Sequence, residues 1–356
     1  MNADDARPAW MLYGANGYTG ELISREAARR GLHPVLAGRH RQQVEALARE
    51  LGLEARVFGL DDVAATATQL AGHCLVLNCA GPFSATAARM MEACLAARVH
   101  YLDITGEIDV FEHAQSLHDR ARTAGIAICP GVGFDVIPTD CVAAALKAAL
   151  PDATRLALGF DSRSGLSPGS ARTSIEGLAH GGKLRRGGRI VTVPLAHAIR
   201  RIDFGDGEKD AMTIPWGDVA TAYHTTGIPD IEVYFAAPPS LIARVRRVNR
   251  IRPVLRWPLV QRFLKARIAK TVHGPDAAQR ARLPTFVWGE ACNPHGATKT
   301  ARIRTANAYS LTITGALAVV EHLLRKRPAG GSYTPSQLAG ADLVTRLPGS
   351  GPLVVR

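Results

Sequence analysis

Three glycines near the start of the chain have the spacing of a loop that could hold a diphosphate. Gly14, Gly17 and Gly20 follow a short apolar run, residues 9–13, and open a segment with helical spacing of apolar residues, 18–30. The first glycine permits a tight turn out of a strand, the second lets the backbone approach a pyrophosphate, and the third lets helix and strand pack closely. The N–H groups and positive dipole end of the helix then attract phosphate. This order predicts the first part of a dinucleotide-binding unit.

The spacing of these glycines is G-x-x-G-x-x-G, which departs from the standard G-x-G-x-x-G. An ordinary glycine-containing turn between a strand and a helix is therefore the alternative. Under the nucleotide interpretation, the residues of this loop predicted to contact the cofactor are Gly14, Asn16, Gly17, Tyr18, Thr19 and Gly20.

The end of the second predicted strand, residues 33–37, indicates which dinucleotide is bound. In an NAD-binding domain this strand usually ends in an acid that accepts a hydrogen bond from the ribose 2′-OH. Here it is followed by Gly38, Arg39, His40 and Arg41, with no acid. A guanidinium at Arg39 can pair with a 2′-phosphate, which favours NADP(H) over NAD(H). The alternative is a solvated arginine at a helix start.

A run of small residues follows the fourth predicted strand, residues 74–78. In a doubly wound sheet this strand lies beside the first at the point where strand order reverses, so the turn after it can run along the cofactor. Phe83 could wall the nicotinamide side; alternatively the turn is structural and Pro82 starts the next helix. The residues predicted to contact the cofactor here are Asn78, Ala80, Gly81, Pro82 and Phe83.

Polar residues after the fifth and sixth strands could supply the other needs of hydride transfer, which are a polarising group and a proton source. Tyr101, Asp103, Thr105 and Glu107 follow or end the fifth strand, and Asp135 follows the sixth. The predicted catalytic candidates are Asp135, Tyr101 and Asp103. Alternatively, Asp135 caps the next helix and Asp103 satisfies backbone N–H groups of a tight loop. No tyrosine has a lysine four residues further on, so the Tyr–Lys mechanism of short-chain dehydrogenases is not indicated. No G-x-S-x-G occurs, so acyl transfer by a serine nucleophile is not indicated either.

The elements that position these residues alternate between apolar strands and amphipathic helices. This alternation predicts an α/β Rossmann fold, a doubly wound parallel sheet with right-handed crossovers. The predicted strands are 9–13, 33–37, 55–58, 74–78, 99–102 and 126–129, and the predicted helices are 18–30, 41–51, 61–70, 85–97 and 110–123.

Beyond residue 152 the alternation fades, which predicts a second, α+β domain. Strands are expected at 155–160, 189–193 and 301–305, and an apolar helix at 312–326. Ser170, Thr173, Lys183 and Arg185 could meet an anionic substrate group or the cofactor, although a solvated loop is an equal alternative. The predicted domains are 1–140 for NADP binding, 141–326 for substrate and dimerisation, and 327–356 as a segment returning to the first domain.

Residues 240–270 hold ten Arg or Lys and no acid, with apolar residues near helical spacing that Pro253 and Pro258 interrupt. A basic amphipathic segment suits a membrane surface or an acidic acyl-carrier protein. The alternative is a pair of helices whose basic face is solvated. Aromatic residues are not interleaved with the cations as in nucleic-acid-binding proteins, so no nucleic-acid partner is expected.

Composition bounds the remaining choices. The chain has 356 residues, 47% of them hydrophobic, and a formal net charge of +12. No apolar run reaches the length of a membrane span. Six cysteines lie in apolar segments without metal-ligand spacing, so we expect reduced thiols, a cytoplasmic location and no structural metal. An open sheet in the second domain would leave a face to cover, which favours a homodimer.

Taken together, the motifs resemble the saccharopine dehydrogenase-like oxidoreductase family, in particular its trans-acting enoyl reductase branch. The segments that carry the resemblance are 14–20, 37–39, 78–83, 101–107, 131–140 and 333–342. The resemblance implies an NADP-binding Rossmann domain, an inserted α+β domain, and reduction of a C=C (enoyl) or related group on a hydrophobic acyl substrate. The rival interpretation is a non-catalytic NADP(H)-binding sensor or scaffold, because no proton donor is evident in the sequence.

Overall fold

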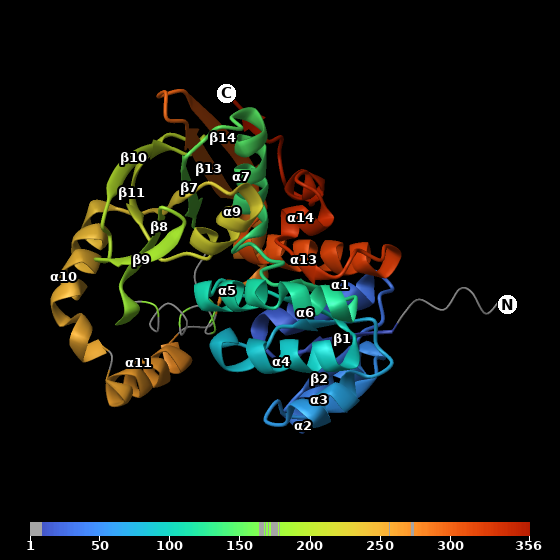
Figure 1. The fold of residues 1–356 in the computed structure, drawn as a ribbon. Coiled ribbons are helices and arrows are strands. Elements are labelled where there is room, and N and C mark those ends of the chain that lie inside the picture. Colours follow the sequence, from blue (N-terminus) through green and yellow to red (C-terminus); the bar gives the residue numbers. More distant parts are fainter. Residues whose placement is uncertain are drawn as a thin grey trace. The chain divides into compact units, whose positions relative to one another are not determined.

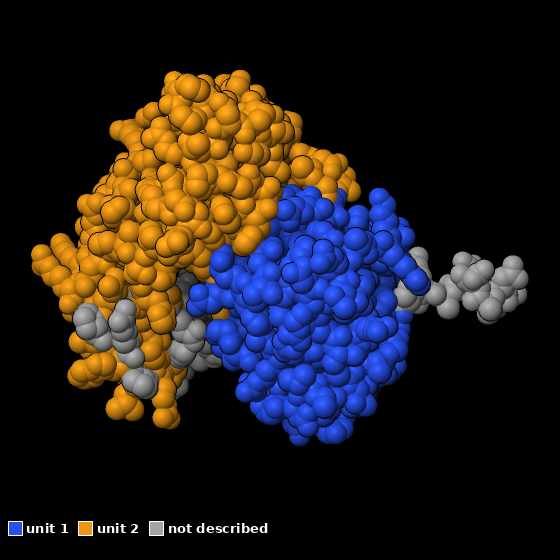
Figure 2. Space-filling view, viewed as in Figure 1, with its two compact units in different colours: residues 1–105, 109–133, 312–339 blue, residues 106–108, 134–311, 340–356 orange. Residues whose placement is uncertain are grey.

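The computed structural model describes residues 9–163, 167, 169, 171, 177, 179–255, 257–271 and 274–356. Its chain divides into two compact units, coloured separately in Figure 2. Unit 1 comprises residues up to Thr105, Asp109–Gly133 and Thr312–Ala339. Unit 2 comprises Gly106–Ile108, Phe134–Leu311 and Gly340–Arg356. Ser170 and Thr173, named above as candidate substrate contacts, lie outside the described residues.

Within its described residues, unit 1 contains a seven-stranded sheet in the order β15-β6-β5-β4-β1-β2-β3, and every pairing is parallel. The order reverses at β1, which confirms the predicted doubly wound class. The strands are β1 Trp10–Tyr13, β2 Val35–Gly38, β3 Ala55–Val57, β4 Leu75–Asn78, β5 His100–Asp103, β6 Ala127–Cys129 and β15 Gly331–Ser332. The helices that lie wholly or mostly in unit 1 are α1 Tyr18–Arg29, α2 Arg41–Leu51, α3 Val63–Leu70, α4 Phe83–Ala97, α5 Ile108–Ser116, α6 His118–Ala124, α13 Ala308–Arg325 and α14 Pro335–Ala339.

The central strands of this sheet are buried on both faces. All four residues of β1 and of β4 are buried, as a parallel strand covered by helices on both sides requires. Helices on the two faces complete the core, with Ile23 of α1 and Met90 of α4 fully buried. The sheet therefore holds the ends of β1 and β4 in fixed register, Tyr13 opposite Asn78.

Unit 2 is built on a mixed sheet. Its main path is β10-β11-β12-β7-β13-β14-β16, and a hairpin of β8 and β9 attaches at β12. The strands are β7 Arg155–Ser162, β8 Gly182–Arg186, β9 Arg189–Val193, β10 Ile199–Asp203, β11 Glu208–Thr213, β12 Asp230–Ala236, β13 Thr285–Cys292, β14 Thr298–Thr305 and β16 Val354–Val355. The helices are α7 Ile137–Ala149, α9 Asp218–Thr226, α10 Pro239–Leu255, α11 Pro258–Thr271, α12 Ala277–Arg282 and the 3₁₀ turn η1 Leu343–Arg346.

Helix α7 packs on the middle of this sheet (Figure 1). The contact is close at Gly289 of β13, where an added Cβ would lie 2.6 Å from Val142 Cγ1 and 2.8 Å from Leu146 Cδ1. Val142 and Leu146 both belong to α7, and both side chains are fully buried. A side chain at 289 would therefore push the helix off the sheet.

Several observed elements differ from the predicted ones, and the apolar helix predicted at 312–326 in the second domain lies in unit 1. The predicted helix 110–123 is two helices, because the last turn of α5 tightens to a bond from Leu117 N–H to Ala114 C=O before α6 begins. The glycine-rich run 181–188 contains strand β8, and Gly187 and Gly188, with φ of 54° and 76°, form the two-residue turn to β9. Finally, the predicted returning segment 327–356 is divided, with residues through Ala339 in unit 1 and those from Gly340 in unit 2.

Within the described part of the chain, no helix combines the length and the apolar character needed to cross a bilayer. The six cysteines are all free thiols. The predicted homodimer stays a prediction.

Substitution of Gly289 tests the packing of α7 on the sheet. We expect Gly289→Ala to lower the free energy of unfolding by about 1–3 kcal/mol, because the added methyl group overpacks the core. Urea denaturation followed by circular dichroism measures the loss. Gly351→Ala is the matched control in the same unit, since its added Cβ would lie 3.7 Å from its nearest neighbour, Arg304 O. Equal stability of the two variants would contradict the packing assignment.

Candidate cofactor and active site

The glycine loop is held by backbone contacts that leave no space for side chains. Gly14 has φ of 80°, and a Cβ there would lie 2.6 Å from Ala80 N; a Cβ on Gly20 would lie 2.2 Å from Gly14 O. Gly14 N–H donates to Ala37 O at 2.7 Å, and Cys79 N–H donates to Tyr13 O at the same distance. The turn after β1, the end of β2 and the turn after β4 therefore form one rigid backbone cluster.

Gly17 differs from its two partners. It is the N-cap of α1, and no side chain caps the helix there. A Cβ on Gly17 would meet its nearest protein atom, Gly14 O, at 3.4 Å, an ordinary contact. The packing of the protein does not require glycine at 17, and the absence of a side chain there leaves the start of α1 accessible. A diphosphate is the group that suits an uncapped helix N-terminus.

Asn16, Tyr18 and Thr19, the other loop residues predicted to contact the cofactor, lie at the start of α1 or just before it. Asn16 Nδ2 donates to Gln43 Oε1 of α2 at 2.7 Å, so its side chain ties the loop to the next helix. Tyr18 and Thr19 form the first turn of α1 and are half-buried. Their contacts with a cofactor stay predictions.

Arg39 is exposed at the end of β2, and among the described residues no carboxylate pairs with its guanidinium. Arg41, two residues on and equally exposed, instead pairs with Glu45 at 2.7 Å. Burial raises the pKa of Tyr13 to about 12, and the positive charge of Arg39 opposes that rise, which places Arg39 near the end of β1. An uncompensated cation beside the glycine loop has the chemistry needed for a ribose 2′-phosphate.

The turn after β4 is shaped by Asn78, which is fully buried. Its Oδ1 accepts from Ala80 N–H at 3.0 Å, and Thr86 Oγ1 donates to Ala80 O at 2.7 Å. Gly81 and Pro82 are exposed, and Pro82 is the N-cap of α4, which begins at Phe83. Pro82 therefore has the structural role given as its alternative, because the helix begins directly after it. Contact of Gly81 and Pro82 with a cofactor stays a prediction.

Tyr101 and Asp103 form a buried polar network that links three strands. Tyr101 Oη donates to Asp103 Oδ2 at 2.6 Å and lies 3.4 Å from Asn78 Nδ2. Asp103 Oδ1 accepts from Thr105 N–H at 2.9 Å and from Gly131 N–H at 2.8 Å. Burial and the neighbouring carboxylate raise the pKa of Tyr101 well above its usual value. Asp103 therefore satisfies backbone N–H groups, which was the alternative to a catalytic role. We assign no catalytic role to Tyr101 or Asp103.

Asp135 lies in a different environment, in the turn before α7 within unit 2. Its carboxylate is half-buried, and no described residue donates a hydrogen bond to it or pairs with it. The N-cap of α7 is Val136, and no side chain caps this helix. Asp135 therefore does not cap α7, which was the alternative to a catalytic role. Burial raises its pKa to about 7. A carboxyl group that titrates near neutral pH can donate and accept protons there.

The surroundings of Asp135 explain this shift. Gly106 lies directly against the carboxylate, since a Cβ on Gly106 would be 2.8 Å from Asp135 Oδ2. Trp216 Nε1 donates to the backbone carbonyl of Asp135 at 2.9 Å, and its ring packs on Phe160 with centroids 4.9 Å apart. An aromatic wall and a close backbone remove water from one side of the acid, which disfavours its charged form.

Sequence reasoning missed a second buried acid in unit 2. Asp218 is fully buried at the start of α9, and Thr139 Oγ1 donates to its Oδ1 at 2.7 Å. Burial raises its pKa well above the usual value, and the charges of Asp140 and Asp135 add to the rise. Asp140 in turn accepts from Thr225 Oγ1. Asp140 lies in the segment 131–140, one of those that carry the family resemblance, so the sequence could have indicated it. No local sequence pattern marks Asp218.

Two cations proposed for substrate contact have structural partners. Arg185 is buried, donates from Nε to Val219 O at 2.6 Å, and stacks 4.2 Å from the centre of the Tyr223 ring. Lys183 Nζ donates to Thr192 Oγ1 across the β8–β9 hairpin at 2.7 Å. Arg185 therefore holds the hairpin against α9. Glu107, half-buried in unit 2, stays a candidate without an assigned role.

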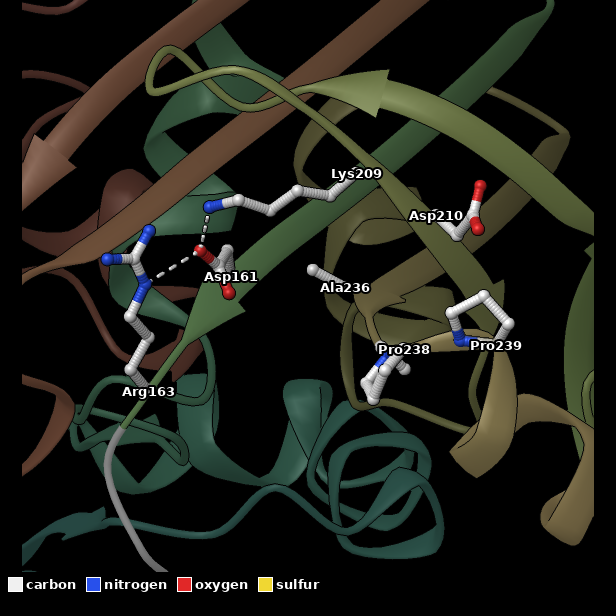
Figure 3. A pocket seen from close by; sticks show the side chains of 8 residues that line it. Asp161, Arg163, Lys209, Asp210, Ala236, Pro238 and Pro239 are labelled. Atoms are coloured by element: carbon white, nitrogen blue, oxygen red, sulfur yellow. Dashed lines mark hydrogen bonds and ion pairs between the residues drawn. The ribbon is translucent and has the colours of Figure 1, made fainter.

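A pocket of about 460 Å³ lies elsewhere in unit 2, between the ends of β7, β11 and β12 (Figure 3). Its cations are already paired: Lys209 Nζ lies 2.5 Å from Asp161 Oδ2, and Arg163 Nε lies 3.4 Å from the same oxygen. Asp210 and Pro238 line the other side. Because the cations are neutralised, this pocket offers no site for an anionic substrate group. Across the described residues, no three His, Cys, Asp or Glu side chains gather as a metal ion would require.

A parallel sheet that reverses at β1, with a glycine loop leading into an uncapped helix, defines a Rossmann dinucleotide-binding protein. Residues 10–129 match the family model described as the saccharopine dehydrogenase NADP binding domain. This match covers about a third of the chain, and it shows that the first part of the chain resembles the NADP-binding domain of that family. The match bears out the predicted resemblance and the predicted NADP(H) cofactor.

Two curated relatives resemble part of the chain. The saccharopine dehydrogenase-like oxidoreductase of Homo sapiens is 30% identical over 165 residues, which are 39% of this chain and 37% of that protein. The trans-acting enoyl reductase of Mycobacterium ulcerans is 32% identical over 138 residues, 36% of this chain and 33% of that protein. The aligned segments thus span about a third of the length of these relatives.

Two solved structures share the fold over nearly the whole chain. Saccharopine dehydrogenase (L-Glu forming) from Saccharomyces cerevisiae has a TM-score of 0.65 at 12% identity, covering 95% of this chain and 96% of that one. Homospermidine synthase from Legionella pneumophila, solved in complex with NAD, has a TM-score of 0.65 at 10% identity, covering 99% and 91%. At these identities the likeness concerns the fold alone, and it includes the second unit.

Removal of the Arg39 cation tests the cofactor site. We expect Arg39→Ala to raise the Kd for NADPH about 10- to 100-fold, the loss typical of a hydrogen bond to a charged group, and to leave the Kd for NADH unchanged. Isothermal titration calorimetry measures both. Arg41→Ala is the matched control, because it removes a nearby exposed arginine already paired with Glu45. An unchanged affinity of Arg39→Ala for NADPH would exclude the proposed phosphate contact.

The raised pKa of Asp135 predicts a pH-dependent stability. In the unfolded chain this group loses its proton near pH 3.8, whereas in the folded protein it keeps the proton until about pH 7. Between about pH 4 and pH 7 the folded state therefore binds more protons than the unfolded state. The free energy of unfolding falls as pH rises through this range.

Asp135→Asn removes this effect, so we expect the variant to gain about 1–3 kcal/mol over the wild type between these pH values and to keep that gain above them. Thermal unfolding at several pH values measures it. Asp210→Asn, which changes a half-buried acid elsewhere in unit 2, serves as control. A pH-independent difference between Asp135→Asn and the wild type would contradict the raised pKa.

Proposed function

We propose that this protein is an NADPH-dependent reductase that saturates the C=C bond of an enoyl group on a hydrophobic acyl substrate. NADPH, when bound, supplies the hydride. The substrate's β-carbon gains the hydride and its electron pair, the α-carbon gains a proton from an acid of the protein, and NADP⁺ and the saturated acyl group leave. The family supports oxidoreductase chemistry, and the Mycobacterium ulcerans relative is named an enoyl reductase.

The observation that carries this proposal is the carboxyl group of Asp135. A reductase of this kind needs a proton source, and the sequence left none evident. Asp135 is half-buried, lacks a hydrogen-bond or ion-pair partner among the described residues, and has a pKa of about 7. It lies in the turn that continues the chain from β6 into α7. In its protonated form it is a general acid suited to neutral pH.

The chain's residues divide the remaining tasks. We propose that the uncapped start of α1 binds the diphosphate, Arg39 binds the 2′-phosphate, and Phe83 and the exposed Gly81–Pro82 turn border the nicotinamide. Tyr101 and Asp103 hold the strand ends that carry these groups. Burial keeps the proton on Asp135, because its carboxyl group is shielded from water and its pKa is raised to about 7. Six free thiols are consistent with a cytoplasmic location, which remains part of this proposal.

Turnover of enoyl thioesters tests the proposal. Purified protein is incubated with NADPH and α,β-unsaturated acyl thioesters of increasing chain length, and the products are identified by mass spectrometry. We expect oxidation of NADPH together with a saturated thioester. Asp135→Asn should lower kcat about 10²- to 10⁴-fold, as loss of a general acid does, while the Kd for NADPH is unchanged. Asp210→Asn is the control and should retain activity.

The pH profile gives a second test of the same assignment. Because the general acid must be protonated, kcat/KM should fall as pH rises above about 7. NADPH binding without turnover of any thioester would favour the rival interpretation, a non-catalytic sensor or scaffold.

A further inference from the structure

Helices α10 and α11 of unit 2 differ in how well they are anchored (Figure 1). The first half of α10 packs on the unit: Leu241, Ile242 and Val245 join a cluster with Met212 and Ala237. The side chain of Asn249 then makes a pair of bonds to the backbone of Leu195, with Oδ1 accepting at 2.8 Å and Nδ2 donating at 3.0 Å. Beyond Asn249 the apolar residues of α10 lose this support.

The segment after Asn249 exposes an unusual amount of apolar surface. Within the described part of the chain, five of the eight exposed large hydrophobic residues fall between residues 251 and 263. They are Ile251 (54% exposed), Val254 (44%), Trp257 (63%), Leu259 (76%) and Phe263 (66%). Leu259 and Phe263 are four residues apart and therefore share one face of α11. Trp257 lies in the connection between the two helices.

Uncompensated positive charge surrounds this apolar surface. The stretch from 240 to 270 contains no acid. Among the described residues, no carboxylate pairs with its exposed arginines, of which Arg246 donates to the backbone carbonyl of Ala196. The other five are Arg244, Arg247, Arg250, Arg262 and Arg267. Some exposed arginines elsewhere, such as Arg41 and Arg120, have Glu partners at 2.7 Å. We call the five apolar residues and these five arginines the basic apolar surface.

We propose that the basic apolar surface binds the protein reversibly to anionic lipid membranes. Exposed aromatic and aliphatic side chains flanked by arginines are the composition of an interfacial helix, whose apolar face enters the headgroup boundary while its cations contact lipid phosphates. Each cation near an anionic surface adds to the attraction. The inference does not rest on the proposed reaction.

Two other occupants fit the surface less well. A second copy of the chain would bring a net charge of +12 against a surface that is itself cationic. An acidic carrier protein would neutralise the arginines, yet side chains as exposed as Trp257, Leu259 and Phe263 would need an apolar partner that a highly charged surface does not provide. A bilayer interface satisfies both the charge and the apolar area.

Vesicle co-sedimentation of the full chain tests the proposal. Phosphatidylcholine vesicles are compared with vesicles in which phosphatidylglycerol makes up about a third of the lipid, a composition that gives a negative surface potential. We expect binding to the anionic vesicles only, and its loss when salt rises from about 0.1 M to about 1 M, because the screening length falls from about 10 Å to about 3 Å. Equal binding to both vesicles, or to neither, would overturn the proposal.

Variants separate the two parts of the surface. The triple variant Arg244→Gln, Arg247→Gln, Arg250→Gln should raise the lipid concentration for half-maximal binding about 100-fold. Its matched control removes three exposed, unpaired arginines elsewhere, Arg49→Gln, Arg98→Gln and Arg189→Gln, and should bind as the wild type does. The pair Leu259→Gln, Phe263→Gln should also release the protein from vesicles. Equal losses in the test and control triples would contradict a localised site.

Tryptophan fluorescence reports insertion directly. Of the four tryptophans, Trp10 and Trp288 are buried and Trp216 is half-buried, so Trp257 is the most exposed. Anionic vesicles should shift the emission to shorter wavelength, and Trp257→Phe should abolish the shift while preserving co-sedimentation. Tight binding to a purified acidic acyl-carrier protein with no vesicle binding would overturn the proposal in favour of that partner.

Discussion

The structure of unit 1 depends on a backbone contact that excludes every side chain. The turn after β1 lies against the turn after β4 so closely that a Cβ on Gly14 would come within 2.6 Å of Ala80 N. A second contact, Gly20 against Gly14 O, brings α1 down onto the same turn. These two approaches fix where α1 starts, and with it the direction of its N–H groups. Gly17, by contrast, is not needed for packing and leaves the start of α1 accessible.

Three acids in this chain show how environment assigns different tasks to one residue type. Asp103 is fully buried but accepts hydrogen bonds from Tyr101 and from two backbone N–H groups, so its charge is satisfied and its role is to join strand ends. Asp135 is less buried but has no such donors among the described residues, and its pKa rises to about 7. Asp218 accepts a hydrogen bond from Thr139 but lies where two further carboxylates disfavour its charge. Hydrogen-bond supply, more than burial alone, separates the structural acid from the chemically available one.

The sequence predicted unit 1 well because its signals are local. Helix α2 was predicted at 41–51 and is found at Arg41–Leu51, where Gly52 ends it in a left-handed conformation. The apolar runs of β1 and β4 likewise marked buried parallel strands. Unit 2 was predicted less well because its contacts join distant segments: Trp216 reaches Asp135 across 81 residues, and Arg185 stacks on Tyr223. The hairpin of β8 and β9 was obscured by its glycines, although the pair Gly187–Gly188 is itself a hairpin signal.

The last strand of the unit 1 sheet comes from far along the chain, and this has a consequence for biosynthesis. β15 pairs with β6, yet Gly331 is made roughly 200 residues after Cys129. At a translation rate of about 5–20 residues per second, the edge of β6 waits on the order of 10–40 s for its partner while the main segment of unit 2, Phe134–Leu311, is synthesised. During that interval the nascent sheet carries an open edge able to pair with other chains. A chaperone that shields this edge, or slow assembly of unit 1 after release, would determine how much of the protein reaches its native state.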